Sequence, residues 1–104
     1  MYLKHNVKIQ GLTPEMLLGI IIINDVYKSY SIDLVITSVT DSKHTAEHSL
    51  HYSGNAIDCR TSNIPINIPR KIILDDLKQA LGPNFQVLDE QTHFHISYKP
   101  VYIG

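Results

Sequence analysis

Apolar side chains recur at intervals of three and four residues along the first third of the chain, which predicts an amphipathic helix. The expected apolar face consists of Met16, Ile20, Ile23, Tyr27 and Tyr30. Thr13 is a suitable N-cap, and Pro14 suits the first helical position because its missing N–H needs no partner there. The additional isoleucines of "GIIII" suggest that this helix is buried on more than one side.

The remaining chain alternates between β-rich runs and one further helical run. "DLVITSV" is β-branched and predicts a strand, and residues 40–53 are polar and predict a loop. "NAIDCR" predicts a short strand with Asp58 and Cys59 on opposite faces. "PRKIILDDLKQALG" predicts a second helix that stops at Gly82 and Pro83. "FQVL" and "HFHISY" predict two strands joined by a hairpin around residues 89–92.

This order of elements predicts an α+β fold in which a small, mainly antiparallel sheet packs against two helices. The chain has 104 residues and shows no internal repeat or linker, so we expect one domain over residues 1–104. Hydrophobic residues make up 43% and charged residues 18%, as in an ordinary globular protein. A net charge of −1 argues against a protein that coats nucleic acid, since such proteins need a basic face.

The cysteine content and the length of the apolar run bear on where in the cell the protein is expected. Cys59 is the one cysteine, which excludes an internal disulfide and a cysteine-rich zinc site. The apolar run "MLLGIIII" has eight residues, too few to span a bilayer, and its flanks do not suit a signal peptide. We therefore expect cytoplasmic synthesis without a signal peptide and no membrane insertion.

Histidines and one aspartate offer the chemistry of a metal site. A catalytic zinc takes three ligands from His, Asp, Glu or Cys and leaves a fourth position for water. A turn at Gly54 would let His51 curl back over Asp58, while His93 and His95 share one face of their strand. These four side chains converge if the two strands are neighbours in the sheet.

The same residues carry a resemblance. "SLHYSGNAID" contains Ser49, His51, Gly54, Ala56 and Asp58 in the pattern S-x-H-x-x-G-x-A-x-D. This pattern resembles the signature of the zinc D-alanyl-D-alanine carboxypeptidase and L-alanyl-D-glutamate endopeptidase family, which shares its fold with the Hedgehog signalling domain. "DEQTHFHIS" resembles the second signature of that family, a His-x-His preceded by an acidic residue. The resemblance covers about residues 35–99 and is closest to small phage and prophage members.

The resemblance implies a Zn²⁺ ion held by His51, Asp58 and one histidine of "HFH". Family members with His-x-His bind through the second histidine, here His95, which leaves His93 to steady the oxyanion. Members with Glu-x-x-His bind through that histidine, and the spacing from Glu90 to His93 fits this as well. The fuller match of "HFHIS" favours His95 as the ligand.

Other site roles follow from the same comparison. Glu90 is the expected general base, since a carboxylate beside zinc-activated water can move its proton to the leaving amine. Asp89 is the competing acid, although a residue at that position also suits a hairpin turn. His44 is expected to contact substrate, and Ser49 is expected either to bond near the substrate or metal or to shape the turn. Relatives often carry an arginine near Lys43, and this chain has none before residue 60.

The expected function is therefore that of a zinc metallopeptidase that hydrolyses a bond in the stem peptide of bacterial peptidoglycan. A phage lytic enzyme of this kind would reach the cell wall through a separate pore-forming protein. The alternative is a non-catalytic, metal-binding member of the same fold that acts as a binding or virion structural module. A different zinc hydrolase, such as a wall amidase, fits the single acid and His-x-His less well.

Overall fold

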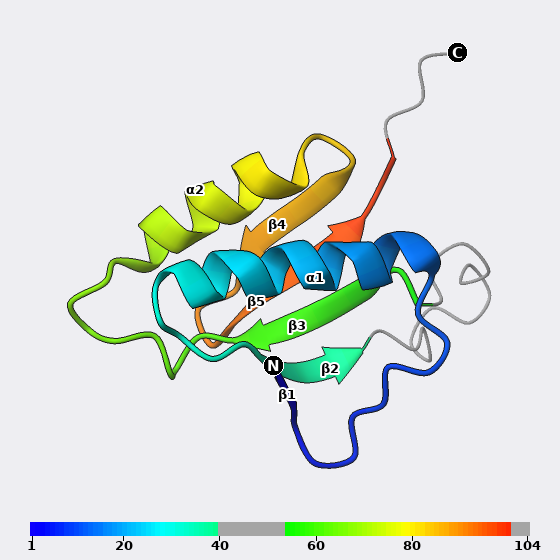
Figure 1. Ribbon diagram of the computed structural model, residues 1–104, viewed down its shortest axis with the longest axis horizontal. Coiled ribbons are helices and arrows are strands. Elements are labelled where there is room, and N and C mark those ends of the chain that lie inside the picture. The colour runs from blue at the N-terminus through cyan, green and yellow to red at the C-terminus, as the bar shows by residue number, and fades with distance from the viewer. Residues whose placement is uncertain (40–53, 101–104) are drawn as a thin grey trace.

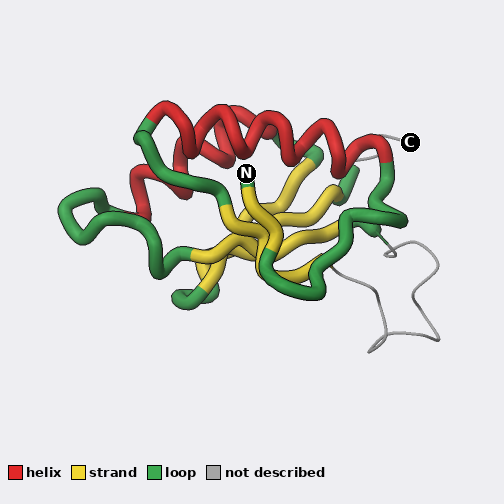
Figure 2. Tube along the Cα trace, turned by 60° about the horizontal axis from the view of Figure 1, so that its bottom comes forward, coloured by secondary structure: helices red, strands yellow, loops and turns green. Residues whose placement is uncertain are grey.

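Two helices cover one face of a single mixed sheet in the computed structural model, which describes residues 1–39 and 54–100 (Figure 1). The sheet order is β1-β2-β3-β5-β4. Its strands are β1 (Tyr2–Leu3), β2 (Val35–Val39), β3 (Ala56–Arg60), β4 (Phe85–Asp89) and β5 (His93–Tyr98). The helices are α1 (Pro14–Ser29) and α2 (Arg70–Leu81). The tube view shows both helices on the same side of the strands (Figure 2).

Three of the four strand pairings are antiparallel, and β1 pairs with β2 in parallel. The prediction of an α+β fold with two helices on a mainly antiparallel sheet is thus confirmed among the described residues. The parallel edge strand β1 was not predicted, because two residues are too short to show an alternating pattern.

The capping residues set the bounds of α1. Thr13 Oγ1 accepts a hydrogen bond from the backbone N–H of Met16 at 3.2 Å, and Pro14 opens the helix. Four of the five predicted apolar residues are buried. The fifth, Tyr30, follows the last helical residue and donates a hydrogen bond to Asp76 of α2. The predicted register of α1 is confirmed.

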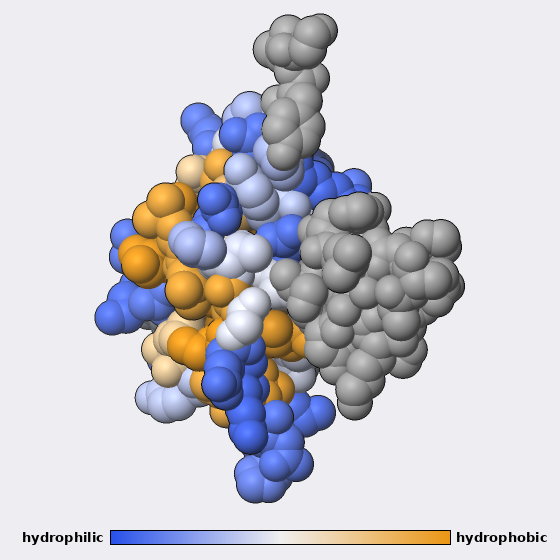
Figure 3. Space-filling model, turned by 90° about the vertical axis from the view of Figure 1, so that its right-hand side faces the viewer, coloured by the Kyte–Doolittle hydropathy of each residue, from blue (hydrophilic) through white to orange (hydrophobic). Residues whose placement is uncertain are grey.

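The expectation that α1 is buried on more than one side is wrong. Leu18 and Ile21 are 60% and 61% exposed, and Leu17 is also exposed. Figure 3, which faces the side of the molecule where α1 begins, shows apolar surface there beside polar side chains. One layer of helices can bury only the stripe that faces the sheet, so apolar residues in excess of that stripe remain at the surface.

The hydrophobic core lies between the helices and the sheet. Its buried residues come from α1, α2, the segments that precede α1 and β2, and alternate positions of the strands. On β3 these are Ile57 and Cys59, and on β5 they are Phe94 and Ile96, as the alternation predicted. The intervening residues of β3 and β5 therefore point to the face that the helices do not cover.

No helix within residues 1–39 and 54–100 is long and apolar enough to cross a membrane.

Candidate metal centre

The register of β3 against β5 brings the two sequence motifs together. Asp58 lies directly opposite His95, and Arg60 lies opposite His93. Directly opposed residues of antiparallel strands point to the same face of the sheet. The condition that the two strands be neighbours is therefore met, although 37 positions separate Asp58 from His95.

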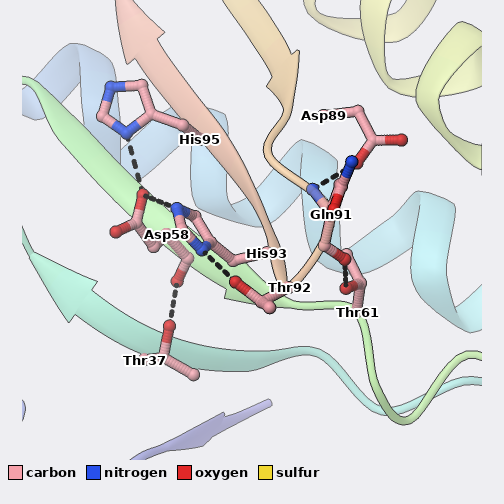
Figure 4. Close-up of polar contacts among 8 residues, drawn as sticks. All are labelled: Thr37, Asp58, Thr61, Asp89, Gln91, Thr92, His93 and His95. Carbon is pink, nitrogen blue, oxygen red and sulfur yellow. Dashed lines mark hydrogen bonds and ion pairs between the residues drawn. The ribbon is translucent and has the colours of Figure 1, made fainter.

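Both histidines approach the same carboxylate oxygen (Figure 4). His95 Nδ1 donates a hydrogen bond to Asp58 Oδ1 at 2.8 Å, and His93 Nε2 lies 3.7 Å from that oxygen. The side chains of Asp58, His93 and His95 are 23%, 31% and 29% exposed. They are thus held by the sheet but can still be reached by an ion or a substrate.

Electrostatics favour the positive charge on His95. The hydrogen bond to Asp58 raises the pKa of His95, and the charges of Asp58 and Glu90 add to this shift, whereas partial burial and the charge of Lys99 oppose it. The carboxylates of Asp58 and Glu90 would also attract a divalent cation, because they stabilise any nearby positive charge.

Two threonines that the sequence did not single out contact Asp58 and His93. Thr92 Oγ1 lies 3.0 Å from His93 Nδ1, which leaves Nε2 of that ring facing Asp58. Thr37 Oγ1 donates to the backbone carbonyl of Asp58 at 3.4 Å. Thr37 lies at a shift of register between Ile36 and Ser38, which is a β-bulge. Bulges often occur beside functional sites, but no spacing in the sequence signals this one.

The two candidate acids occupy different positions of the hairpin. Asp89 is paired with the buried Phe94, and its Oδ2 lies 3.6 Å from Arg70 Nη2 of α2. Glu90 follows in the turn before β5, and its charge acts on His95. Asp89 therefore serves the hairpin and the helix side, whereas Glu90 is the acid whose charge acts on His95.

The glycine of the first motif has a structural reason to be glycine. Gly54 has φ +77°. A Cβ built on it would lie 2.1 Å from the carbonyl oxygen of Gly11, and Thr13 donates its N–H to the carbonyl of Gly54. The chain that enters α1 thus packs directly on the turn that precedes β3.

Cys59 is fully buried on the core side of β3. Burial raises the pKa of its thiol, and the charge of Asp58 raises it further. A buried neutral thiol is a poor metal ligand, so Cys59 is a core residue, as predicted.

The expected residues His44, Ser49 and His51 lie outside the described residues. Within the described ranges no group of three His, Cys, Asp or Glu side chains is arranged to hold a metal. Two of the three expected ligands, Asp58 and His95, are both present and adjacent.

Asp58 and His95 can bind one metal ion together if their ligand atoms move slightly apart. Zinc–nitrogen and zinc–oxygen bonds of about 2.1 Å at a tetrahedral angle place two ligand atoms roughly 3.4 Å apart. The present hydrogen bond of 2.8 Å is shorter by roughly 0.6 Å, so rotation of either side chain would open the space. Half-buried side chains at the sheet surface can make this adjustment without moving the strands.

Comparisons of the chain with models of known protein families, with curated proteins and with solved structures gave no match.

Proposed function

We propose that this protein is a zinc-dependent peptidase that hydrolyses a peptide bond in the stem peptide of bacterial peptidoglycan. The observation that carries the proposal is the apposition of Asp58 and His95 across β3 and β5, with His93 beside them. These residues belong to the two motifs that resemble the carboxypeptidase and endopeptidase family. The Hedgehog-like fold is part of the same proposal.

In this proposal His51, Asp58 and His95 hold the metal. Zinc bound there would polarise the scissile carbonyl and acidify a water molecule. The contacts of His93 suit its assignment as oxyanion donor: Thr92 occupies the Nδ1 side of the ring, and Nε2 points into the site. A donor fixed in this way can stabilise negative charge on the carbonyl oxygen without first being reorganised.

Glu90 is the group that moves the proton. Glu90 is an exposed residue of the β4–β5 turn, and its charge acts on His95. It would accept a proton from the attacking water and deliver it to the nitrogen of the leaving amine. Ser49 and His44 are proposed to contact the substrate.

The test uses purified peptidoglycan as substrate. Zinc-loaded protein should release new amino termini, a chelator should abolish the release, and added zinc should restore it. Glu90→Gln should keep one equivalent of zinc and lose at least about 100-fold in kcat. Asp75→Asn is the matched control, since Asp75 lies on α2 and pairs with Lys71 of the same helix, and it should keep most of its activity.

If the protein binds one equivalent of zinc but releases no amino termini, the proposed peptidase activity is refuted. That result would instead support the non-catalytic, metal-binding alternative.

A further inference from the structure

The turn between β4 and β5 is fastened by side chains from two other parts of the fold. Gln91, at its centre, has φ +72°, a conformation that non-glycine residues seldom adopt. Its carbonyl oxygen accepts hydrogen bonds from Thr61 Oγ1, at 2.6 Å, and from Arg70 Nη1. Figure 4 shows the bond from Thr61. Two donors from different segments thus hold one carbonyl.

The other side of the same residue is held as well. Asp89 Oδ1 accepts the backbone N–H of Gln91 at 2.8 Å, and Asp89 Oδ2 pairs with Arg70 Nη2 at 3.6 Å. We call Thr61, Arg70, Asp89 and Gln91 the turn clamp. Both polar backbone groups of Gln91 are therefore engaged within the clamp.

The clamp sits at the point where the proposed site is assembled. Thr61 directly follows Arg60, which pairs with His93, and the N–H of Thr61 donates to the carbonyl of Thr92 at 3.3 Å. Arg70 is the first residue of α2. The clamp thus joins the end of β3 and the start of α2 to the three-residue turn from which His93 emerges.

A strained backbone held by several side chains is typical of functional positions. The turn needs no such clamp to join two strands, because hairpin loops of similar length form without help from other elements. Thr61 is also nearly fully buried, at 5% exposed, so its hydroxyl gains little unless it has a partner. The clamp therefore fixes the backbone between Glu90 and His93.

We infer that Thr61 and Arg70 are positioning residues, which hold Gln91 and thereby aim His93 and Glu90 at Asp58. The inference rests on the proposed function for its catalytic meaning. The geometry it describes belongs to the metal-free protein and can be measured there.

The experiment compares Thr61→Val and Arg70→Gln, alone and combined, with the unaltered protein. Thr61→Val keeps the shape of the side chain and removes its hydroxyl, whereas Thr61→Ser keeps the hydroxyl and should restore the original behaviour. Lys71→Gln is the control for α2, because Lys71 pairs with Asp75 and not with the turn.

Three quantities are measured. The first is amide hydrogen exchange of Glu90 and Thr92, whose N–H groups bond within the turn. The second is the strength of proton cross-relaxation between the His93 ring and the Asp58 side chain in the metal-free protein. The third is kcat and KM of the zinc-loaded protein on stem peptide, alongside the melting temperature.

We expect exchange to quicken about fivefold in each single variant, as for the loss of one hydrogen bond, and further in the double variant. The cross-relaxation between His93 and Asp58 should weaken in the double variant. In the double variant kcat should fall about tenfold with little change in KM. Thr61→Ser and Lys71→Gln should behave like the unaltered protein.

Unchanged exchange, or quicker exchange with an unchanged contact between His93 and Asp58, overturns the inference. Unchanged kcat in an active protein also overturns it, since the clamp would then serve the fold alone. If the unaltered protein cleaves no stem peptide, the proposed function fails, and the exchange and cross-relaxation results still decide the inference.

Discussion

Replacement of Gly54 by alanine tests whether the first motif is built on a contact between two backbone segments. Gly54 has φ +77°, and a new Cβ would lie 2.1 Å from the carbonyl oxygen of Gly11 and 3.0 Å from Leu12 Cα. These neighbours are backbone atoms, so no side chain can rotate away. The segments would have to separate by roughly 1 Å to restore ordinary contact distances.

The cost has two parts. A non-glycine residue at positive φ costs about 1 to 3 kcal/mol, and overpacking in a closed site costs about as much again. We therefore expect Gly54→Ala to lower the free energy of unfolding by about 2 to 6 kcal/mol. For a domain of this size the melting temperature would fall by at least about 10 °C.

Gly11→Ala is the matched control. Gly11 also has positive φ, at +92°, but a Cβ there meets nothing within 4 Å. It should therefore show only the conformational part, about 1 to 3 kcal/mol. The assay is denaturant unfolding followed by circular dichroism. If Gly54→Ala costs no more than Gly11→Ala, the two segments are not in contact and the structural reason for this glycine is wrong.

Two further predictions concern the helix layer and the His95–Asp58 pair. Ile23→Ala, at a fully buried site on α1, should lower the free energy of unfolding by about 2 to 5 kcal/mol, measured with denaturant. Ile21→Ala, at a site that is 61% exposed, should lower it by less than about 1 kcal/mol. Equal losses would contradict the one-sided burial of α1. In the metal-free protein Asp58→Asn should lower the pKa of His95, followed by NMR, because it removes the main cause of the upward shift. The raised pKa stabilises the fold fully below the unfolded-state value of about 6.5, and this stabilisation is lost as pH rises through the folded-state pKa. Asp58→Asn should therefore flatten the dependence of stability on pH in that window, and an unchanged profile would show that the pair does not couple to folding.

Local features of the fold could be predicted from the sequence because their causes are local. Thr13 and Pro14 set the start of α1, and Gly82 follows the end of α2. Alternation placed Asp58 and Cys59 on opposite faces of β3. Each of these predictions depends on neighbours within a few positions.

The features that were missed depend on distant contacts. Periodicity does not tell how many sides of α1 will be covered, so Ile21 was expected inside and lies at the surface. That Asp89 faces the helices and pairs with Arg70 depended on the register of β4 against β5. The roles of Thr61 and Arg70 arise because the loop after β3 and the start of α2 meet the same turn, and no motif marks them.

Zinc binding by the metal-free protein tests the central claim most directly. A calorimetric titration should show one equivalent bound by the unaltered protein, with affinity at least about 100-fold weaker in Asp58→Ala and His95→Ala, which each lose a ligand. His93→Ala should retain most of the affinity. If the unaltered protein binds no zinc, or if Asp58→Ala and His95→Ala bind it as well as the unaltered protein does, then Asp58 and His95 form an ion pair of the sheet and not part of a metal centre.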